Sequence, residues 1–474
     1  MGRTIKLAKI EREKLFNHFK DKLETAYYLN RQSVSFQANK SEPIYRWFKF
    51  KEGFSSTLVK YFLEKYSNKP GRILDPFAGA GTTLFTAQEL GWESHGIELL
   101  PVASFIMKMR QAVKNINISI LNNTKKNLWD ILDDIKQPEI HIKHISITKD
   151  AFPNETEEYL NKFLTYCSKI NNPELSLILR FAAFSVLEGI SFTRKDGQYL
   201  RWDHRAKRNL KGTSFDKGKI YSFKYALNSK LNQIIEDLSG NRQISLFNNT
   251  ETKNIKQFPA NIIDGSCLEE LPKLETNFFD FIITSPPYCN RYDYTRTYAL
   301  ELVYLGYNAE QVRNLRQTML SSTVENKEKL EYLKSLYSSF NQRNVFNYIL
   351  NIYNNSNAMS EVNSTLEELN KLGSLNNKNI PRMVKNYFLE MCFVVYEMAR
   401  VIKKDGYSVM VNDNVRYGGE EIPVDLILSE FAENFGFEVE KIFILPKGKG
   451  NSSQQMGNYG RTEIRKCVYL WRKK

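Results

Sequence analysis

The chain has 474 residues, a length that allows about two or three domains, or one core with large insertions. Hydrophobic residues make up 42% and aromatic residues 13%, and this composition excludes disorder throughout the chain. Lysine and arginine number 67 against 53 acidic residues, and the net charge of +14 favours a polyanionic partner such as nucleic acid.

Targeting and metal-binding signals are absent from the sequence. No apolar run approaches the roughly 18 to 20 residues of a membrane-spanning helix, and residues 1–16 are too charged for a signal peptide. We therefore expect a cytoplasmic protein with no membrane partner. The five cysteines are scattered, and His141 and His144 form the only close histidine pair without a third ligand nearby. This spacing predicts neither disulfides nor a metal site.

Residues 71–98 have the pattern of a β-α-β unit. Arg72–Asp75 is a short buried-strand pattern, the glycine-rich segment Pro76–Thr83 follows it, and Leu84–Leu90 resumes helical spacing. A second strand pattern covers Ser94–Glu98. Such a unit predicts a parallel α/β architecture.

The turn inside this unit has the composition of a nucleotide-binding site. Gly79 and Gly81 allow close approach of a ligand to the backbone, and the following helix N-terminus offers unpaired N–H groups. The turn lacks the third glycine of the dinucleotide fingerprint and the Gly-Lys-Ser/Thr of a P-loop. Glu98 ends the second strand, where a carboxylate accepts both hydroxyls of an unphosphorylated ribose. Asp75 is placed to bind a cationic amino group, although a plain β-α-β turn with a surface acid is the alternative.

A helical, polar pattern covers residues 101–258 and reads as an insertion. Its basic stretch is interleaved with the aromatic residues Phe192, Tyr199 and Trp202. The cations of this stretch are Arg194, Lys195, Arg201, Arg205, Lys207, Arg208 and Lys211. Contact with DNA phosphates and a solvated charged face are both open interpretations.

Ser285-Pro286-Pro287-Tyr288 follows a second group of strand patterns, Asn261–Asp264 and Phe279–Thr284. The motif lies at the carboxyl edge of the sheet, so it faces the same crevice as the glycine turn. The prolines remove donors and leave a rigid set of acceptors, which are the Ser285 hydroxyl and backbone carbonyls. Acceptors of this kind favour the nucleophilic form of an aromatic amine, and the tyrosine can stack on a base rotated out of the duplex.

The rest of the chain returns to an α/β pattern after a second helical region at residues 298–380. The expected elements are a helix at Tyr387–Ile402, a strand at Tyr407–Val411, a helix at Val424–Phe435, and strands at Val439–Leu445 and Lys466–Trp471.

The two motifs together resemble the amino-methylating DNA methyltransferases of bacterial restriction-modification systems. Asp75-Pro76-Phe77-Ala78-Gly79-Ala80-Gly81-Thr82 is similar to the cofactor motif of that family. Thr284–Tyr288 is similar to its catalytic motif in the form most typical of N4-cytosine enzymes, whereas N6-adenine relatives usually carry Asp or Asn at the position of Ser285. Gly450–Arg461 resembles the end of the same fold.

The resemblance implies an α/β, doubly wound Rossmann-like methyltransferase core with large helical insertions, which uses S-adenosyl-L-methionine on double-stranded DNA. It also implies a helix at Trp47–Ser55 over the methionine end of the cofactor, and Asp264 near the adenine. The expected cofactor-binding residues are Lys51, Glu52, Phe54, Ser55, Asp75, Phe77, Gly79, Gly81, Thr82, Glu98 and Asp264. The expected catalytic residues are Ser285, Pro286, Pro287 and Tyr288, and a cognate restriction endonuclease is an implied partner.

We expect the chain to fall into five segments. These are 1–100, the cofactor-binding part of the core; 101–258, a helical insertion for DNA recognition; 259–297, the catalytic part; 298–380, a second helical insertion; and 381–474, the C-terminal part of the core.

The expected reaction is direct methyl transfer to N4 of a flipped cytosine, with no covalent intermediate. The alternatives are N6-adenine methylation, methylation of an RNA amine by the same fold, and a catalytically silent DNA-binding module. Cys289 follows Tyr288 and lacks the Pro-Cys pair of C5-cytosine enzymes, so an ordinary buried thiol is expected there.

Overall fold

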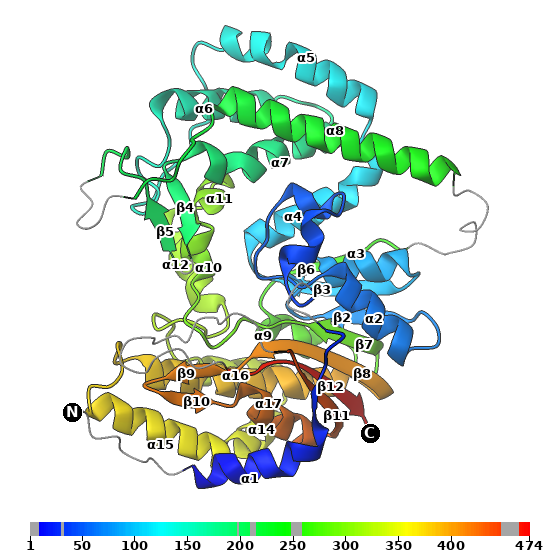
Figure 1. Ribbon diagram of the computed structural model, residues 1–474, viewed down its shortest axis with the longest axis vertical. Helices are drawn as coiled ribbons and strands as arrows, with labels where there is room; N and C mark the ends of the chain where they lie inside the picture. Colours follow the sequence, from blue (N-terminus) through cyan, green and yellow to red (C-terminus); the bar gives the residue numbers. More distant parts are fainter. Residues whose placement is uncertain (1–8, 30–32, 197–198, 209–214, 248–257, 447–463) are drawn as a thin grey trace.

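The computed structural model describes residues 9–29, 33–196, 199–208, 215–247, 258–446 and 464–474. Figure 1 shows two lobes, one containing the large sheet and the other made mainly of helices from the first predicted insertion. Two features of the sequence, Lys211 in the basic stretch and the Gly450–Arg461 segment, lie outside the described residues.

A mixed sheet forms the centre of the first lobe. Its strands are β1 Leu23–Thr25, β2 Arg72–Asp75, β3 Glu93–Glu98, β6 Asn261–Asp264, β7 Phe279–Thr284, β8 Ile402–Asp413, β11 Phe437–Ile444 and β12 Lys466–Lys473. Among the described residues they pair in the order β1, β11, β12, β8, β7, β2, β3, β6. β12 is antiparallel to both neighbours, and the other pairs are parallel. The predicted Rossmann-like α/β fold is confirmed.

The order of the strands locates the ligand crevice. The chain runs from β2 outward to β3 and β6, and from β7 outward to β8 in the opposite direction. Ligands of open α/β sheets bind outside the carboxyl ends of the strands where this direction reverses. β2 ends at Asp75 and β7 at Thr284, so the glycine turn and the Ser285–Tyr288 motif begin side by side at that point.

Alternate residues of the central strands enter two separate hydrophobic cores. Ile73 packs with α2 and α3, whereas its neighbour Leu74 joins the core of α16 and α17. Phe281 and Ile282 divide in the same way. Side chains along a strand point to opposite faces, so a sheet covered by helices on both faces needs the continuous apolar runs that the sequence shows. These helices are α2 Ser56–Tyr66, α3 Thr82–Glu89, α16 Ile380–Val401 and α17 Val424–Asn434.

The helical lobe contains most of the predicted first insertion. It comprises α5 Ile118–Asp134, α6 Asn154–Ser168, α7 Pro173–Ile190 and α8 Phe223–Phe247, together with the hairpin strands β4 Thr193–Asp196 and β5 Tyr199–Trp202 (Figure 1). α4, Pro101–Ala112, contacts both β3 and β6 of the large sheet and α7 of this lobe. The basic stretch, expected among helices, is therefore carried by a β-hairpin.

The second predicted insertion packs in two places. α11 Ala299–Tyr304 and α12 Ala309–Thr318 contribute to the core of the helical lobe. α13 Leu330–Ser339, α14 Arg343–Asn355 and α15 Asn357–Lys371 pack with α16 beneath the large sheet. The smaller elements are α1 Ile10–Phe19, α9 Cys267–Glu270, α10 Tyr294–Thr297, β9 Val415–Tyr417 and β10 Glu420–Ile422. Within the described ranges, no helix combines the length and the apolar character needed to cross a membrane.

Candidate active site

The two glycines of the turn after β2 have different functions. The Gly79 amide donates to Oε2 of Glu98 over 2.7 Å, which joins the turn to the end of β3. Gly81 has a φ of +79°, and a Cβ placed there would lie 2.6 Å from the Phe85 ring and 2.8 Å from Met107. Gly81 therefore allows α3 and α4 to pack closely, and it is not among the residues that line the two cavities of this site.

The Glu98 carboxylate is held at the end of β3 by backbone donors. Besides the Gly79 amide, the Leu100 amide donates to Oε1 over 2.6 Å. Burial outweighs these hydrogen bonds and raises the pKa of Glu98 to about 7. Each oxygen retains a further lone pair, so this carboxylate can still accept hydroxyl groups. Thr82, the first residue of α3, is buried and lines no described cavity of this site.

Asp75 joins three elements and lines neither cavity of the site. Its carboxylate accepts the Phe77 amide over 3.0 Å and the hydroxyls of Thr83 and Thr284, both over 2.7 Å. Burial raises the pKa of Asp75 to about 6. The predicted contact of Asp75 with a cationic amino group has no counterpart in this arrangement, because the carboxylate is only 1% exposed and binds neighbouring protein groups.

Two adjoining cavities lie at the carboxyl edge of the sheet. The larger one, the amine cleft, has a volume of about 510 Å³ and is lined by Lys51, Glu52, Phe54, Ser285, Pro286, Tyr288, Tyr292, Tyr294, Asp413 and Lys466, among others. The smaller one, the nucleoside cavity, has a volume of about 70 Å³ and is lined by Phe50, Glu52, Phe77, Gly79, Glu98, Leu99, Ser266, Pro287, Tyr294, Met319 and others. Glu52, Ser285 and Tyr294 line both.

The Ser285–Tyr288 motif separates the two cavities. Pro286 and Tyr288 line the amine cleft, Pro287 lines the nucleoside cavity, and Ser285 lines both. The hydroxyl groups of Ser285 and Tyr288 are 3.5 Å apart. Burial raises the pKa of Tyr288 well above its usual range, so the phenol stays neutral. Cys289 is fully buried and burial raises the pKa of its thiol, which disfavours the thiolate that a C5-cytosine mechanism requires.

The predicted helix over the cofactor, Trp47–Ser55, is not helical in the structure. A single turn ends at Trp47, the next eight residues are turn or irregular, and α2 starts at Ser56. Ser55 is the N-cap of α2, where its hydroxyl accepts the Leu58 amide and donates to the Ser33 carbonyl. It is fully buried and reaches neither cavity. Lys51, Glu52 and Phe54 do line the amine cleft.

Asp264 lies outside both cavities. Its carboxylate pairs with Lys108 over 2.6 Å and accepts the Ser104 hydroxyl, and half of the side chain is exposed. Ser266, two residues later, lines the nucleoside cavity instead. Asp264 lines a third cavity of about 400 Å³, whose walls share Leu99 and Gly265 with the nucleoside cavity. The predicted position of Asp264 near an adenine stays a prediction.

Several residues of the site were not predicted from the sequence. Tyr292 and Tyr298 donate to the two oxygens of Glu52, and each hydrogen bond measures 2.5 Å. Asp413 and Lys466 form an ion pair of 2.8 Å at the edge of the amine cleft. Tyr292 and Tyr298 stand close to Asp293 and Tyr294 in the sequence just after the motif. This concentration of tyrosines was the signal that could have identified them as site residues.

Some of the cations predicted to contact DNA are exposed, whereas others already bind groups of the protein. Arg194 and Lys207 are exposed on the hairpin and the loop after it, and Arg201 is partly exposed beside Asp196. Lys195 is buried, and its Nζ donates to Glu301 over 2.5 Å. The alternation along β4 turns the Lys195 side chain inward, so its predicted contact with DNA has no support in this arrangement and stays a prediction.

Asp203 fixes the base of this hairpin and binds Arg205. Both guanidinium contacts, of 2.6 and 2.9 Å, go to the Asp203 carboxylate. Arg208 also has protein partners, since it donates to the Ser146 carbonyl and lies over the Trp202 ring. Arg205 and Arg208 are thus less available to phosphates than Arg194 or Lys207.

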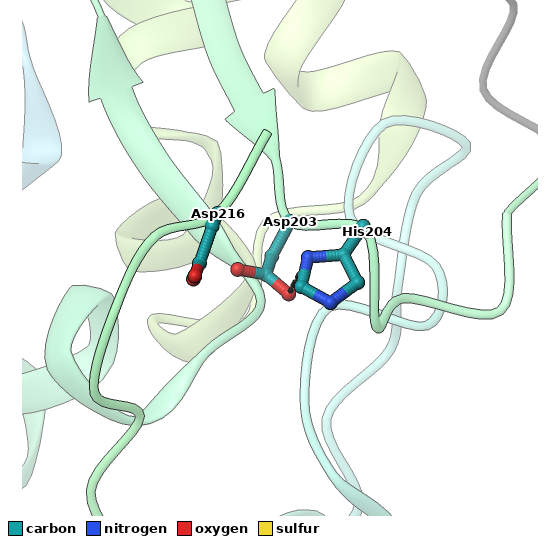
Figure 2. Close-up of side chains that lie close together, drawn as sticks. All are labelled: Asp203, His204 and Asp216. Atoms are coloured by element: carbon teal, nitrogen blue, oxygen red, sulfur yellow. Dashed lines mark ion pairs between the residues drawn. The ribbon is translucent and has the colours of Figure 1, made fainter. Parts of the chain in front are cut away.

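Figure 2 shows Asp203 beside His204 and Asp216, a group whose ligand atoms lie within 4.8 Å of one another. The Asp203 carboxylate also accepts the Lys217 amide over 2.7 Å, and its arginine pairing holds the pKa well below its usual range. A carboxylate already bound to a guanidinium is a poor metal ligand, so this group stabilises the hairpin base.

Comparison with known proteins agrees with this geometry. A family model described as DNA methylase matches residues 6–108. The Type II methyltransferase M.AvaI of Nostoc sp. is 46% identical over 466 residues, which cover 97% of this chain and 92% of the relative. M.BsoBI of Geobacillus stearothermophilus, also a Type II methyltransferase, is 41% identical over 485 residues, which cover 98% and 92% of the two chains. No solved structure matches the chain. The chain therefore belongs to the amino-methylating family of Type II DNA methyltransferases, which act in restriction-modification systems.

Proposed function

We propose that the protein transfers a methyl group from S-adenosyl-L-methionine to the exocyclic N4 of cytosine in double-stranded DNA. The observation that carries this proposal is the position of Ser285, which lines both cavities with a short neutral hydroxyl beside Pro286. Serine at this position is the usual residue of the N4-cytosine enzymes that the motif resembles.

The residues of the nucleoside cavity fit the proposed cofactor. Glu98 provides a carboxylate for the ribose hydroxyls, and Phe77, Ile97 and Leu99 provide apolar walls for an adenine.

The chain itself holds and activates the amine. S-adenosyl-L-methionine supplies an electrophilic methyl group when it is bound. The Ser285 hydroxyl and the Pro286 carbonyl accept N–H groups of the target amine and so direct its lone pair toward the nucleoside cavity. Tyr288 stacks on the flipped base in the amine cleft and offsets part of the cost of unstacking. No protein nucleophile is needed, because the amine lone pair forms the new bond to the methyl group, the sulfur keeps the electron pair of the broken bond, and the methylated amine releases one proton to water.

The hairpin and the surrounding helical lobe are the proposed DNA-recognition region, within the segment 101–258. A restriction endonuclease acting on the same site is the proposed partner, because Type II methyltransferases protect the sites that such enzymes cut.

N6-adenine methylation is the second candidate, and a specific feature favours it as an alternative. A neutral hydroxyl and a carbonyl accept from the amine of adenine as readily as from that of cytosine. The discriminating experiment is mass spectrometry of nucleosides from DNA of cells that express the protein. We expect N4-methylcytosine; N6-methyladenine alone would replace the base assignment, and 5-methylcytosine would contradict amine methylation altogether.

Removal of the exposed hairpin cations should weaken binding to DNA of any sequence. We expect the triple variant Arg194→Ala/Arg201→Ala/Lys207→Ala to lower the slope of log affinity against log salt by about 2 to 3, because each phosphate contact contributes about 0.9 to that slope. Fluorescence anisotropy with a non-target duplex at several salt concentrations measures the slope. The double variant Lys371→Ala/Lys404→Ala changes exposed cations of the other lobe and should leave it unchanged. An unaltered slope in the triple variant would identify the hairpin as a solvated charged face.

A further inference from the structure

Glu52 occupies the place where the two cavities meet. Only Glu52, Ser285 and Tyr294 line both of them. Under the proposed function, on which this inference rests, the cofactor nucleoside fills one cavity and the target amine fills the other. The reacting methyl group has to lie at their junction, together with the sulfonium that carries it. Glu52 is the one carboxylate among the three shared residues, and a carboxylate is the natural partner of a cation.

Two tyrosine hydroxyls fix the orientation of this carboxylate. Tyr292 donates to Oε1 and Tyr298 to Oε2, each over 2.5 Å. Burial and the charge of Glu52 raise the pKa of both phenols well above their usual range, so both remain donors. A carboxylate oxygen that accepts one hydrogen bond keeps a second lone pair. Glu52 is therefore rigidly placed while both of its oxygens remain able to face a cation.

Lys195 in turn fixes Tyr298. The Tyr298 ring is fully buried and stacks on Phe50 with a centroid distance of 5.4 Å and an interplanar angle of 11°. Nζ of Lys195 lies 4.4 Å from the centre of the same ring and donates to Glu301. The side chains of Lys195 and Glu301 are only 5% and 2% exposed. The Tyr298 ring is thus held between the Phe50 ring and the Lys195 ammonium. These contacts orient its hydroxyl toward Glu52.

The buried ion pair needs an explanation other than stability. Desolvation of two charges largely cancels their attraction, and apolar replacements of buried pairs are often neutral or stabilising. The pair also joins the DNA-facing hairpin, through Lys195 on β4, to α11, through Glu301. The Lys51 ammonium donates to the Lys195 carbonyl over 3.0 Å, so the segment that carries Glu52 contacts the same strand.

We propose that Glu52 selects the sulfonium cation of the cofactor over the uncharged sulfur of its product, and that Lys195, through Tyr298, positions the Glu52 carboxylate for this. Glu52 contacts the ligand, whereas Lys195 and Tyr298 are positioning residues. The attraction ends when the methyl group leaves, because the sulfur then carries no charge. Release of the product is thereby favoured over release of the cofactor.

The test compares two ligands that differ in this charge. Calorimetry measures the Kd of S-adenosylmethionine and of S-adenosylhomocysteine for the full-length protein. We expect Glu52→Gln to weaken the charged ligand about tenfold or more and to change the neutral one less than about threefold. Tyr298→Phe, which keeps the ring and removes only the hydroxyl, should shift the ratio in the same direction without lowering Tm. Lys195→Met should do so as well, and Lys195→Arg should restore most of the ratio.

Lys217 provides a matched control. It is a half-buried lysine in the segment after the hairpin, and its Nζ donates to backbone carbonyls, including that of Ser191 over 2.7 Å, without reaching either cavity. Lys217→Met should lower Tm and leave the ratio of the two Kd values unchanged. Equal weakening of both ligands by Glu52→Gln, or a wild-type ratio in Tyr298→Phe, would overturn the inference. Failure of the wild-type protein to bind either ligand would instead contradict the proposed function.

Discussion

Replacement of Tyr288 by alanine should lower the rate of methyl transfer about 5- to 150-fold while the Kd of the cofactor changes less than about threefold. Tyr288 lines the amine cleft and is not among the residues of the nucleoside cavity. The loss of its ring removes a stacking surface for the flipped base, and stacking of one base on an aromatic side chain contributes about 1 to 3 kcal/mol. The target amine then spends less time beside Ser285, so the rate falls with little effect on the cofactor.

Single-turnover methylation of a duplex substrate and calorimetry with the cofactor measure the two quantities. Tyr332→Ala is the matched control, because this tyrosine is exposed on α13, lines neither cavity and donates to Glu269. It should affect neither quantity. A Tyr288→Ala variant with a wild-type rate would exclude stacking in the amine cleft, and a variant with lost cofactor binding would place Tyr288 in the nucleoside cavity.

The central strands and the two motifs were predictable because their signals are local. Arg72–Asp75 and Phe279–Thr284 are continuous apolar patterns next to special turns, and the structure gives both strands these bounds. The long helix expected at Tyr387–Ile402 begins earlier, at Ile380, because Pro381 fits the first helical turn and acts as a start signal. The presence of this helix was thus predictable from the sequence, whereas its first residue depends on the proline start signal.

The site was predictable only where a residue acts through its own position on the sheet edge. Glu98 and Ser285 line cavities because the carboxyl ends of parallel strands converge there. Lys195 was expected to face DNA. Its partner Glu301 lies 106 residues away in the sequence, and no local pattern indicates that the two residues form a pair. Ser55 and Asp75 similarly have their capping and linking roles through contacts that appear only when separate segments pack together.

Replacement of Glu98 by glutamine should weaken cofactor binding about 10- to 100-fold at pH 8, because two hydrogen bonds to a charged acceptor become bonds to a neutral one. The wild-type affinity should also depend on pH. Burial raises the pKa of Glu98 to about 7 in the ligand-free protein, and ribose hydroxyls bind best to the ionised form. The affinity should therefore fall about tenfold per pH unit below pH 7, level off above it, and lose this dependence in the variant.

The contribution of Glu98 to the stability of the fold should decrease as the pH rises, whereas the cofactor affinity should increase. The two measurements therefore test the ionisation of the same group independently. The folded-state pKa of Glu98 lies above its ordinary value of 4.5, so the folded protein binds this proton more tightly. The resulting stabilisation is complete below about pH 4.5 and is lost as the pH rises through about 7. The Tm of Glu98→Gln relative to wild type should therefore be higher at pH 8 than at pH 5 in the absence of cofactor. Glu93→Gln, at the other end of β3 and paired with Arg72, should leave cofactor affinity unchanged. A cofactor affinity for Glu98→Gln equal to that of wild type at pH 8 would show that the ribose lies elsewhere.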